Sequence, residues 1–262
     1  MLASFDWHTF WDRIFGVDSA FASALFATIY IAVIAQALGV LLGLMAALMR
    51  MSRLRVFQVI SGLYVWVFRG TPVIVQIFFV YFGVNILFGI TVIPNSLNLG
   101  AFTLGGAAFA GILALGFNEG AYMREIIRAG IDSVDKGQLE AARSLGMTHG
   151  LAMRRVVLPQ AARVIVPPLG NEFNNMLKTT SLLFFIGVVE LWGNAEIGYS
   201  QTFKPVEYFA AVALWYLLLT TIWTVIQSRI ERRLAVSDRD ESALTTGERL
   251  RGAFSTAYRG RA

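Results

Sequence analysis

Two ionisable side chains, Arg69 and Glu172, stand inside long apolar segments, where a charge is costly unless it has a partner or water. Arg69 begins the run Arg69-Gly70-Thr71-Pro72. Because proline removes a backbone donor and disfavours helical geometry in the residue before it, we predict a helix break at this run. Freed backbone N–H groups and the Thr71 hydroxyl could bind a carboxylate there.

Glu172 could bind an ammonium group, since an intramembrane carboxylate needs a cation, a hydrogen-bond network or water. Thr179 follows seven residues later and lies on the same face of the predicted helix. A structural alternative stays open, in which Glu172 pairs with Arg69 or Arg163 and only holds helices together.

The composition indicates a membrane protein, because 56% of the 262 residues are hydrophobic and only 15% are charged. The segments 21–49 and 206–226 each exceed the roughly 20 residues that cross a ~30 Å hydrocarbon core. Their continuous apolar runs predict helices and not the alternating strands of a barrel. With no cysteine and two histidines, the chain offers little for a metal site, and no nucleophile and base pair suggests a membrane enzyme.

Basic residues cluster where apolar segments end, as membrane topology requires, so the net charge of +5 does not indicate nucleic-acid binding. We predict an all-α, polytopic helical bundle of five transmembrane helices with the N-terminus outside and the C-terminus cytoplasmic. Six crossings would place the basic island at 124–163 outside, so we reject them. The five predicted spans are 21–49, a broken span at 56–93, 102–117, 164–180 and 208–226.

Three regions follow from this topology. Residues 1–19 form an interfacial N-terminal segment whose aromatic side chains rest at the membrane surface, with no cleaved signal. Residues 20–236 form the transmembrane domain, which includes a cytoplasmic loop at about 133–160. The polar residues 237–262 are expected to be a disordered cytoplasmic tail.

The cytoplasmic loop carries two short amphipathic helices. Leu139, Ala142, Arg143 and Gly146 recur at helical spacing and predict a helix that begins after Asp135 and ends at Gly146. A second basic helix is expected over 150–158, stopping at Pro159. Such helices could simply lie on lipid headgroups.

The loop resembles the EAA loop of permease subunits of ABC importers. The resemblance rests on Glu140-Ala141-Ala142, Gly146, Leu158 and Pro159, with Val156 where isoleucine is usual. The segments 68–72, 122–131 and 178–182 also resemble the polar amino-acid permease family, which takes up histidine, glutamine and arginine. The resemblance covers roughly residues 20–232.

The resemblance implies a transporter subunit and not an enzyme. The EAA helix would dock on a separate ATPase, with six coupling residues: Glu140, Ala141, Ala142, Gly146, Leu158 and Pro159. The chain has no G-x-x-x-x-G-K-[ST] loop, so no cofactor is expected on it, and ATP and Mg would bind the partner. Expected partners are two ATPase subunits, a second permease copy or a related permease, an extracytoplasmic amino-acid-binding protein and the lipid of a prokaryotic cytoplasmic (inner) membrane, with no nucleic acid.

The resemblance also implies a substrate pocket near the membrane midplane. Its expected residues are Arg69, Gly70, Thr71, Pro72, Glu172, Asn175, Thr179 and Ser181. Thr179 stands where the family commonly has an acidic residue, which favours neutral polar or acidic amino acids over arginine or lysine. The alternative function, a self-sufficient secondary carrier or channel, would need coupling-ion carboxylates and paired repeats, and neither is clear here. The amino acid itself, a homodimer or heterodimer of permeases, and the role of the tail stay open.

Overall fold

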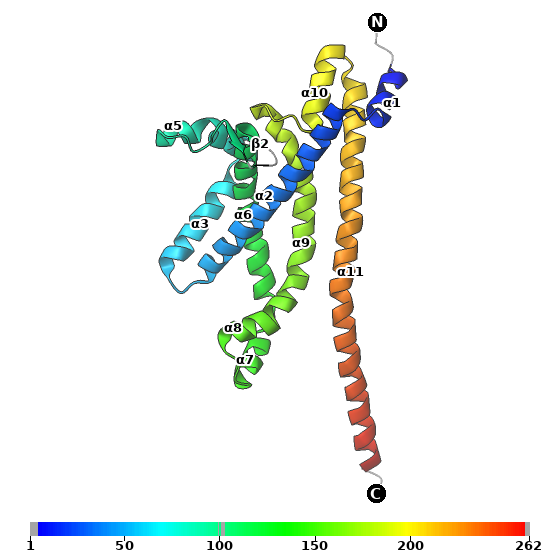
Figure 1. Ribbon diagram of the computed structural model, residues 1–262. Coiled ribbons are helices and arrows are strands. Elements are labelled where there is room, and N and C mark those ends of the chain that lie inside the picture. Colours follow the sequence, from blue (N-terminus) through cyan, green and yellow to red (C-terminus); the bar gives the residue numbers. More distant parts are fainter. Residues whose placement is uncertain (1–4, 99, 101–102, 260–262) are drawn as a thin grey trace.

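The computed structural model describes residues 5–98, 100 and 103–259, with side chains described up to residue 234. This part of the chain is mostly helical (Figure 1). The elements, in order, are α1 (Trp7–Phe15), α2 (Ser19–Met51), α3 (Arg55–Gly70), α4 (Val73–Phe78), a π-helical turn (Phe79–Gly83), α5 (Val84–Phe88), strands β1 (Ser96–Asn98) and β2 (Thr103–Gly105), α6 (Gly106–Asp132), α7 (Lys136–Ser144), α8 (His149–Ala152), a second π-helical turn (Met153–Val157), α9 (Leu158–Thr179), a 3₁₀ turn (Thr180–Ile186), α10 (Leu191–Thr202) and α11 (Pro205–Arg259).

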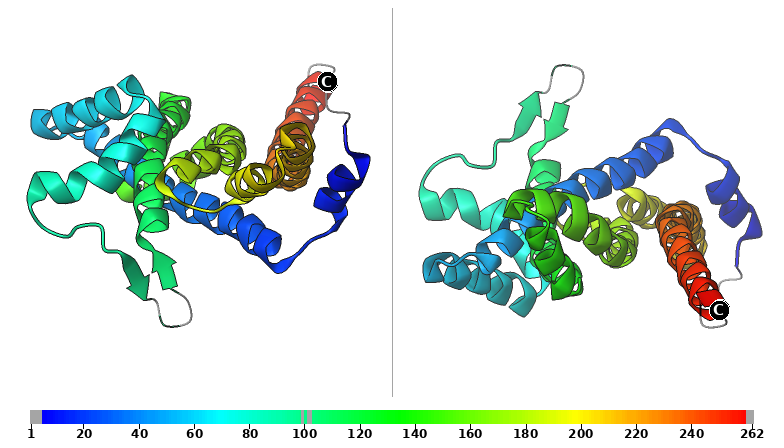
Figure 2. Two further views of the ribbon diagram at one scale, coloured as in Figure 1. Left: turned by 90° about the horizontal axis from the view of Figure 1, so that it is seen from above. Right: turned by 90° about the horizontal axis from the view of Figure 1, so that it is seen from below.

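The elements are arranged along one long axis (Figure 1). Helices α1 and α10 lie at the end of the molecule near the N-terminus, whereas α7 and α8 project toward the other end, as does the C-terminal part of α11. Seen along that axis, α3 to α5 and the antiparallel β1–β2 hairpin lie on one side, and α1 and α11 on the other (Figure 2). The main core lies between α2, α6, α9 and the 3₁₀ turn.

Glycines allow α2 and α6 to cross closely. Gly39 and Gly43 on α2 both pack against Gly120 on α6, and Gly116 on α6 packs against Leu38, so each helix presents two glycines four residues apart at the contact. A Cβ atom at Gly43 would lie 2.9 Å from the Arg124 backbone nitrogen and 3.0 Å from the Gly120 carbonyl oxygen. Small residues at this spacing let helix backbones pack tightly in membranes.

The predicted helix break is confirmed. Helix α3 ends at Gly70, α4 begins at Val73, and the two halves are bent by 107°. The cause is local, because Pro72 lacks an N–H and stands as the residue that precedes α4.

The helices coincide in place with the five predicted spans, although the number of crossings stays a prediction. By length and composition, α2 and the 205–234 part of α11 could each cross a membrane, and two bent pairs could each add one crossing. These pairs are α3 with the segment 73–88, and 149–186 with α10, the latter bent by 49°.

Three expectations about local structure need correction. The helix expected to stop at Pro159 instead continues, because the second π-helical turn leads into α9 and Pro159 stands in its first turn, where no amide donor is needed. The span expected from 102 begins at Gly106, after β2. The tail expected to be disordered over 237–262 has helical backbone to Arg259, in line with its many good helix formers, and residues 260–262 lie outside the described part.

Helix α1 is fastened to the beginning of α11. Lys204 Nζ donates to Asp6 Oδ2 at 2.6 Å and to Thr9 Oγ1 at 3.0 Å, and the Asp6 amide donates to Glu207 Oε1 at 2.8 Å. Asp6 also caps the amides of the first turn of α1. Opposite-charge pairing and capping therefore hold this short helix against the bundle.

Helix α9 contains Pro167 and Pro168 and is supported by α11. Trp223 Nε1 donates to the Gly170 carbonyl at 2.7 Å, and Gln227 Nε2 donates to the Pro167 carbonyl at 3.1 Å. These side chains bind carbonyls in the part of α9 that the prolines weaken.

Candidate functional site

A polar cavity of about 390 Å³ lies between the break after α3, the middle of α6 and the C-terminal half of α9. Polar and ionisable groups dominate the side chains around it. The lining residues are Thr71, Pro72, Val73, Leu115, Asn118, Glu119, Tyr122, Glu172, Asn175, Met176 and Thr179.

Gln76 organises the broken helix that forms one wall. Its Nε2 lies 2.8 Å from the Phe68 carbonyl, 3.0 Å from the Thr71 carbonyl and 2.9 Å from Thr71 Oγ1. Asn118 Nδ2 in turn donates to Gln76 Oε1 at 3.0 Å, which ties the break to α6. The Thr71 hydroxyl already donates to the Val67 carbonyl at 2.9 Å, so its free capacity is as an acceptor.

Two carboxyl groups line the cavity from different helices. Glu119 on α6 is only 4% exposed and accepts a hydrogen bond of 2.9 Å from Gln36 Nε2 on α2. Glu172 on α9 is half-buried. Among the ion pairs of the described residues, none joins Glu172 to Arg69, whose guanidinium carbon lies 5.1 Å from the centre of the Tyr122 ring. The structural pairing of Glu172 with Arg69 is therefore not favoured.

The structure brings together five of the eight residues expected in the pocket. Thr71, Pro72, Glu172, Asn175 and Thr179 line one cavity. Arg69 and Gly70 end α3 directly beside it.

Ser181 does not join that set. It lies in the 3₁₀ turn, and with Lys178 it lines a separate cavity near α10 and α11. Its hydroxyl donates to the Lys178 carbonyl at 2.7 Å.

Sequence reasoning missed Asn118, Glu119 and Tyr122. A signal for them exists, because Leu115, Asn118, Glu119 and Tyr122 are spaced by three, four and seven residues and so share one face of α6. The signal is hidden because the charges that follow, at Arg124, Glu125 and Arg128, are typical of a solvated helix end.

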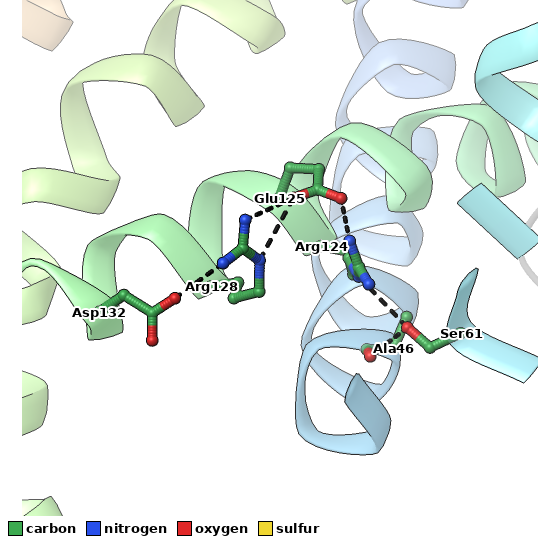
Figure 3. Close-up of polar contacts among 6 residues, drawn as sticks. All are labelled: Ala46, Ser61, Arg124, Glu125, Arg128 and Asp132. Atoms are coloured by element: carbon green, nitrogen blue, oxygen red, sulfur yellow. Dashed lines mark hydrogen bonds and ion pairs between the residues drawn. The ribbon is translucent and has the colours of Figure 1, made fainter. Parts of the chain in front are cut away.

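Further along α6, Arg124 is also buried, with only 5% of its surface exposed. Its Nε donates to Ser61 Oγ at 3.2 Å, Ser61 Oγ donates to the Ala46 carbonyl at 2.8 Å, and the guanidinium pairs with Glu125 (Figure 3). Arg128 continues the series with Glu125 at 3.2 Å and Asp132 at 2.8 Å. This network connects α2, α3 and α6 between the cavity and the end of the molecule that carries α7.

Helix α7 has the limits that the sequence predicts. Asp135 caps it through the Gly137 amide at 2.6 Å, and Gly146 ends it with a left-handed φ of 81°. Glu140 and Ala141 are exposed, whereas Ala142 is buried against the rest of the loop. Leu158 and Pro159 are exposed at the beginning of α9. The exposed residues could contact another protein.

A helical bundle with a polar cavity among its apolar helices and a small-faced helix projecting from one end is the architecture of a membrane transport subunit. Comparison with known proteins identifies the family. Residues 39–236 match the family described as binding-protein-dependent transport system inner membrane component, and the chain belongs to it.

Several relatives support this assignment. The arginine transport system permease protein ArgU of Corynebacterium glutamicum is 41% identical over 87% of this chain and 72% of its own length. The glutamine transport system permease protein GlnP of Escherichia coli K12 is 33% identical over 88% and 99%. A solved structure titled as an amino acid ABC transporter with histidines is 39% identical, with a TM-score of 0.75 over 88% of this chain and 100% of that one. A MetNI methionine ABC transporter chain, 16% identical with a TM-score of 0.66 over 82% and 96%, shares the fold.

Proposed function

We propose that this chain is the permease subunit of an ABC importer for amino acids, and that the imported amino acid has a cationic side chain. The observation that carries the proposal is the polar cavity beside the α3–α4 break, which two carboxyl groups line. Relatives named as arginine, glutamine and general amino-acid permeases support the class.

The charge of the cavity supports the cationic side chain. Its described lining includes Glu119 and Glu172 and contains no lysine or arginine. Arg69 stands beside the cavity, where its guanidinium lies over the Tyr122 ring. An amino acid with a cationic side chain brings two positive groups, the α-ammonium and the side chain, so each carboxylate gains a partner. The earlier preference for neutral or acidic amino acids counted the acidic group lost at Thr179 but not the one present at Glu119.

The family and the geometry also support a proposal for the partner proteins and for the membrane orientation. Exposed Glu140, Gly146, Leu158 and Pro159 at the α7 end would contact a separate ATPase that binds ATP and Mg, two ATPase subunits serving a pair of permeases. The α1 and α10 end would face an extracytoplasmic binding protein. Five crossings with the N-terminus outside and the C-terminus inside a prokaryotic cytoplasmic membrane satisfy every basic cluster.

The test is uptake by the assembled complex in vesicles, supplied with arginine, glutamine or glutamate. Glu119→Gln and Glu172→Gln each remove one charge-assisted contact worth about 1.5–3 kcal/mol, so the KM for arginine should rise about 10- to 150-fold in both variants. The KM for glutamine, which lacks the side-chain cation, should rise in only one variant, the one whose carboxylate binds the α-ammonium. Glu231→Gln on α11, which leaves a hydrogen-bonding partner for Gln227, is the matched control.

Unchanged arginine KM in both variants, or glutamate as the best substrate of the unaltered complex, would overturn the cationic assignment. Transport by the permease alone in liposomes without ATP would instead favour the self-sufficient carrier and overturn the assignment to an ABC importer.

A further inference from the structure

A third cavity, of about 480 Å³, lies at the turn of the hairpin made by α2 and α3 and along one face of α3. We call it the α2–α3 groove. Arg50 in the last turn of α2 and Arg55 at the start of α3 line its polar end, and Gln58 lies beside them. The other lining residues are Val59, Gly62, Leu63 and Trp66, which follow one face of α3.

The polar end of the groove carries uncompensated positive charge. No aspartate or glutamate occurs between residues 19 and 118, so the hairpin has no acidic group of its own. Among the ion pairs of the described residues, none includes Arg50 or Arg55. Arg50 is also repelled by Arg124 on α6, whose own partner is Glu125. An anion bound between Arg50 and Arg55 would offset the positive charge at this end of the groove and reduce the repulsion between Arg50 and Arg124.

The rest of the groove is apolar and open. Val59, Leu63 and Trp66 are exposed, Trp66 by 74%. Apart from the neighbouring backbone of α3 itself, no atom of the described residues lies within 4 Å of a Cβ atom built at Gly62, so this glycine leaves a notch between the exposed side chains. Because α2 could cross a membrane, and α3 could do so with the segment 73–88, this surface faces lipid chains.

We propose that the α2–α3 groove binds an anionic phospholipid, with its phosphate between Arg50 and Arg55 and an acyl chain along Val59, Gly62 and Trp66. Basic pockets at the ends of transmembrane helices suit acidic headgroups, and a phosphate can receive the forked donors of arginine. This lipid site is separate from the import function. Only its assignment to the cytoplasmic leaflet depends on the membrane orientation proposed above.

The neighbouring docking region leaves this groove accessible. Helices α7 and α8 project beyond the turn between α2 and α3 (Figure 1), so a protein docked on α7 contacts a different part of the molecule. The turn between α2 and α3, which carries Arg50 and Arg55, is therefore left accessible to lipid headgroups.

The test measures binding of fluorescently labelled phosphatidylglycerol to the purified permease–ATPase complex in a phosphatidylcholine bilayer. Each arginine near an anionic headgroup contributes about fivefold in affinity, so the double variant Arg50→Gln with Arg55→Gln should bind about 25-fold more weakly. Arg53→Gln removes one positive charge from the same turn without lining the groove, so it is the matched control for Arg50→Gln alone, which should bind about fivefold more weakly.

Gly62→Leu tests the acyl-chain half of the site and leaves every topogenic arginine in place. The added side chain meets open space, so the helix should fold, and it should occupy the notch and lower the affinity for phosphatidylglycerol. Labelled phosphatidylcholine should bind weakly to every variant.

Three results would overturn the proposal. They are equal losses in Arg53→Gln and Arg50→Gln, unchanged binding in Gly62→Leu, and displacement of the lipid by millimolar inorganic phosphate. Amino-acid uptake measured in parallel separates these results from a failure of the import function.

Discussion

The close crossing of α2 and α6 predicts that a single methyl group at Gly43 destabilises the whole bundle. The Cβ of Gly43→Ala would lie 2.9 Å from the Arg124 backbone nitrogen and 3.0 Å from the Gly120 carbonyl oxygen, and closer still to Met123 Cβ. Since these atoms belong to the backbone of α6 or are attached directly to it, no rotamer change relieves the overlap. The two helices must separate along their contact.

The magnitude follows from two opposing effects. Overpacking a tight contact costs about 1–3 kcal/mol, and alanine in place of glycine within a helix returns about 1 kcal/mol. The same substitution at Gly62 meets open space and keeps only the favourable part. The two variants should therefore differ in free energy of unfolding by about 1–3 kcal/mol, with Gly43→Ala the less stable.

The assay is reversible unfolding of both variants and the unaltered chain in mixed detergent micelles, followed by circular dichroism. Gly62→Ala serves as the control for helix propensity. Equal unfolding midpoints for Gly43→Ala and Gly62→Ala would refute the inference that the glycines set the distance between α2 and α6.

Two further predictions concern the ends of the molecule. Gly146→Ala forces a side chain into a left-handed φ of 81°, at a cost of about 1–2 kcal/mol, so ATP hydrolysis should continue while uptake per ATP falls. An unchanged ratio of uptake to hydrolysis would contradict a coupling role for this turn. At the other end, the hydrogen bonds from Lys204 and Thr9 hold the pKa of Asp6 below its usual range, and Asp6 raises the pKa of Lys204. Attachment of α1 should thus be complete from about pH 4 to 10, weakening as pH falls through the usual and then the lowered carboxyl pKa, and as it rises through the raised lysine pKa. Spin labels on engineered cysteines in α1 and α11, which meet no native cysteine, would report the separation, and an unchanged distance at pH 7 in Asp6→Asn would exclude the ion pair as the fastening.

Local signals in the sequence were enough for the helix boundaries that matter most. Pro72 interrupts α3 by its own chemistry, and Asp135 and Gly146 cap and end α7 through contacts within a few residues. These features need no knowledge of distant parts of the chain, so the break and the limits of α7 could be predicted.

Features that depend on contacts between helices could not be read in the same way. The role of Gly39 and Gly43 becomes visible only when α6 lies opposite them, with Gly120 at the contact. Likewise, the charges after Glu119 suggested a solvated helix end, whereas packing against Gln36 places Glu119 in the cavity.

Ser181 illustrates a different error. At 100° per residue, the nine positions from Glu172 to Ser181 turn a helix by about half a circle, so the two side chains would point apart even in an unbroken helix. The 3₁₀ turn that begins at Thr180 keeps Ser181 on the side of α10 and α11. Ser181 was expected in the pocket because it belongs to the 178–182 segment that resembles the permease family, although its angular position on the helix indicates otherwise.

The tight glycine contact also determines which walls of the cavity can move relative to each other. The wall on α6 moves only together with α2, whereas the opposite wall stands on α9, about 25 Å along the helix axis from Leu158 to Asn175. A tilt of α9 by about 10° about its Leu158 end, next to α7 and α8, would shift Asn175 by about 4 Å, more than the length of a hydrogen bond. A small rotation applied at the α7 end could therefore dismantle the binding site without any change in the shape of its individual walls.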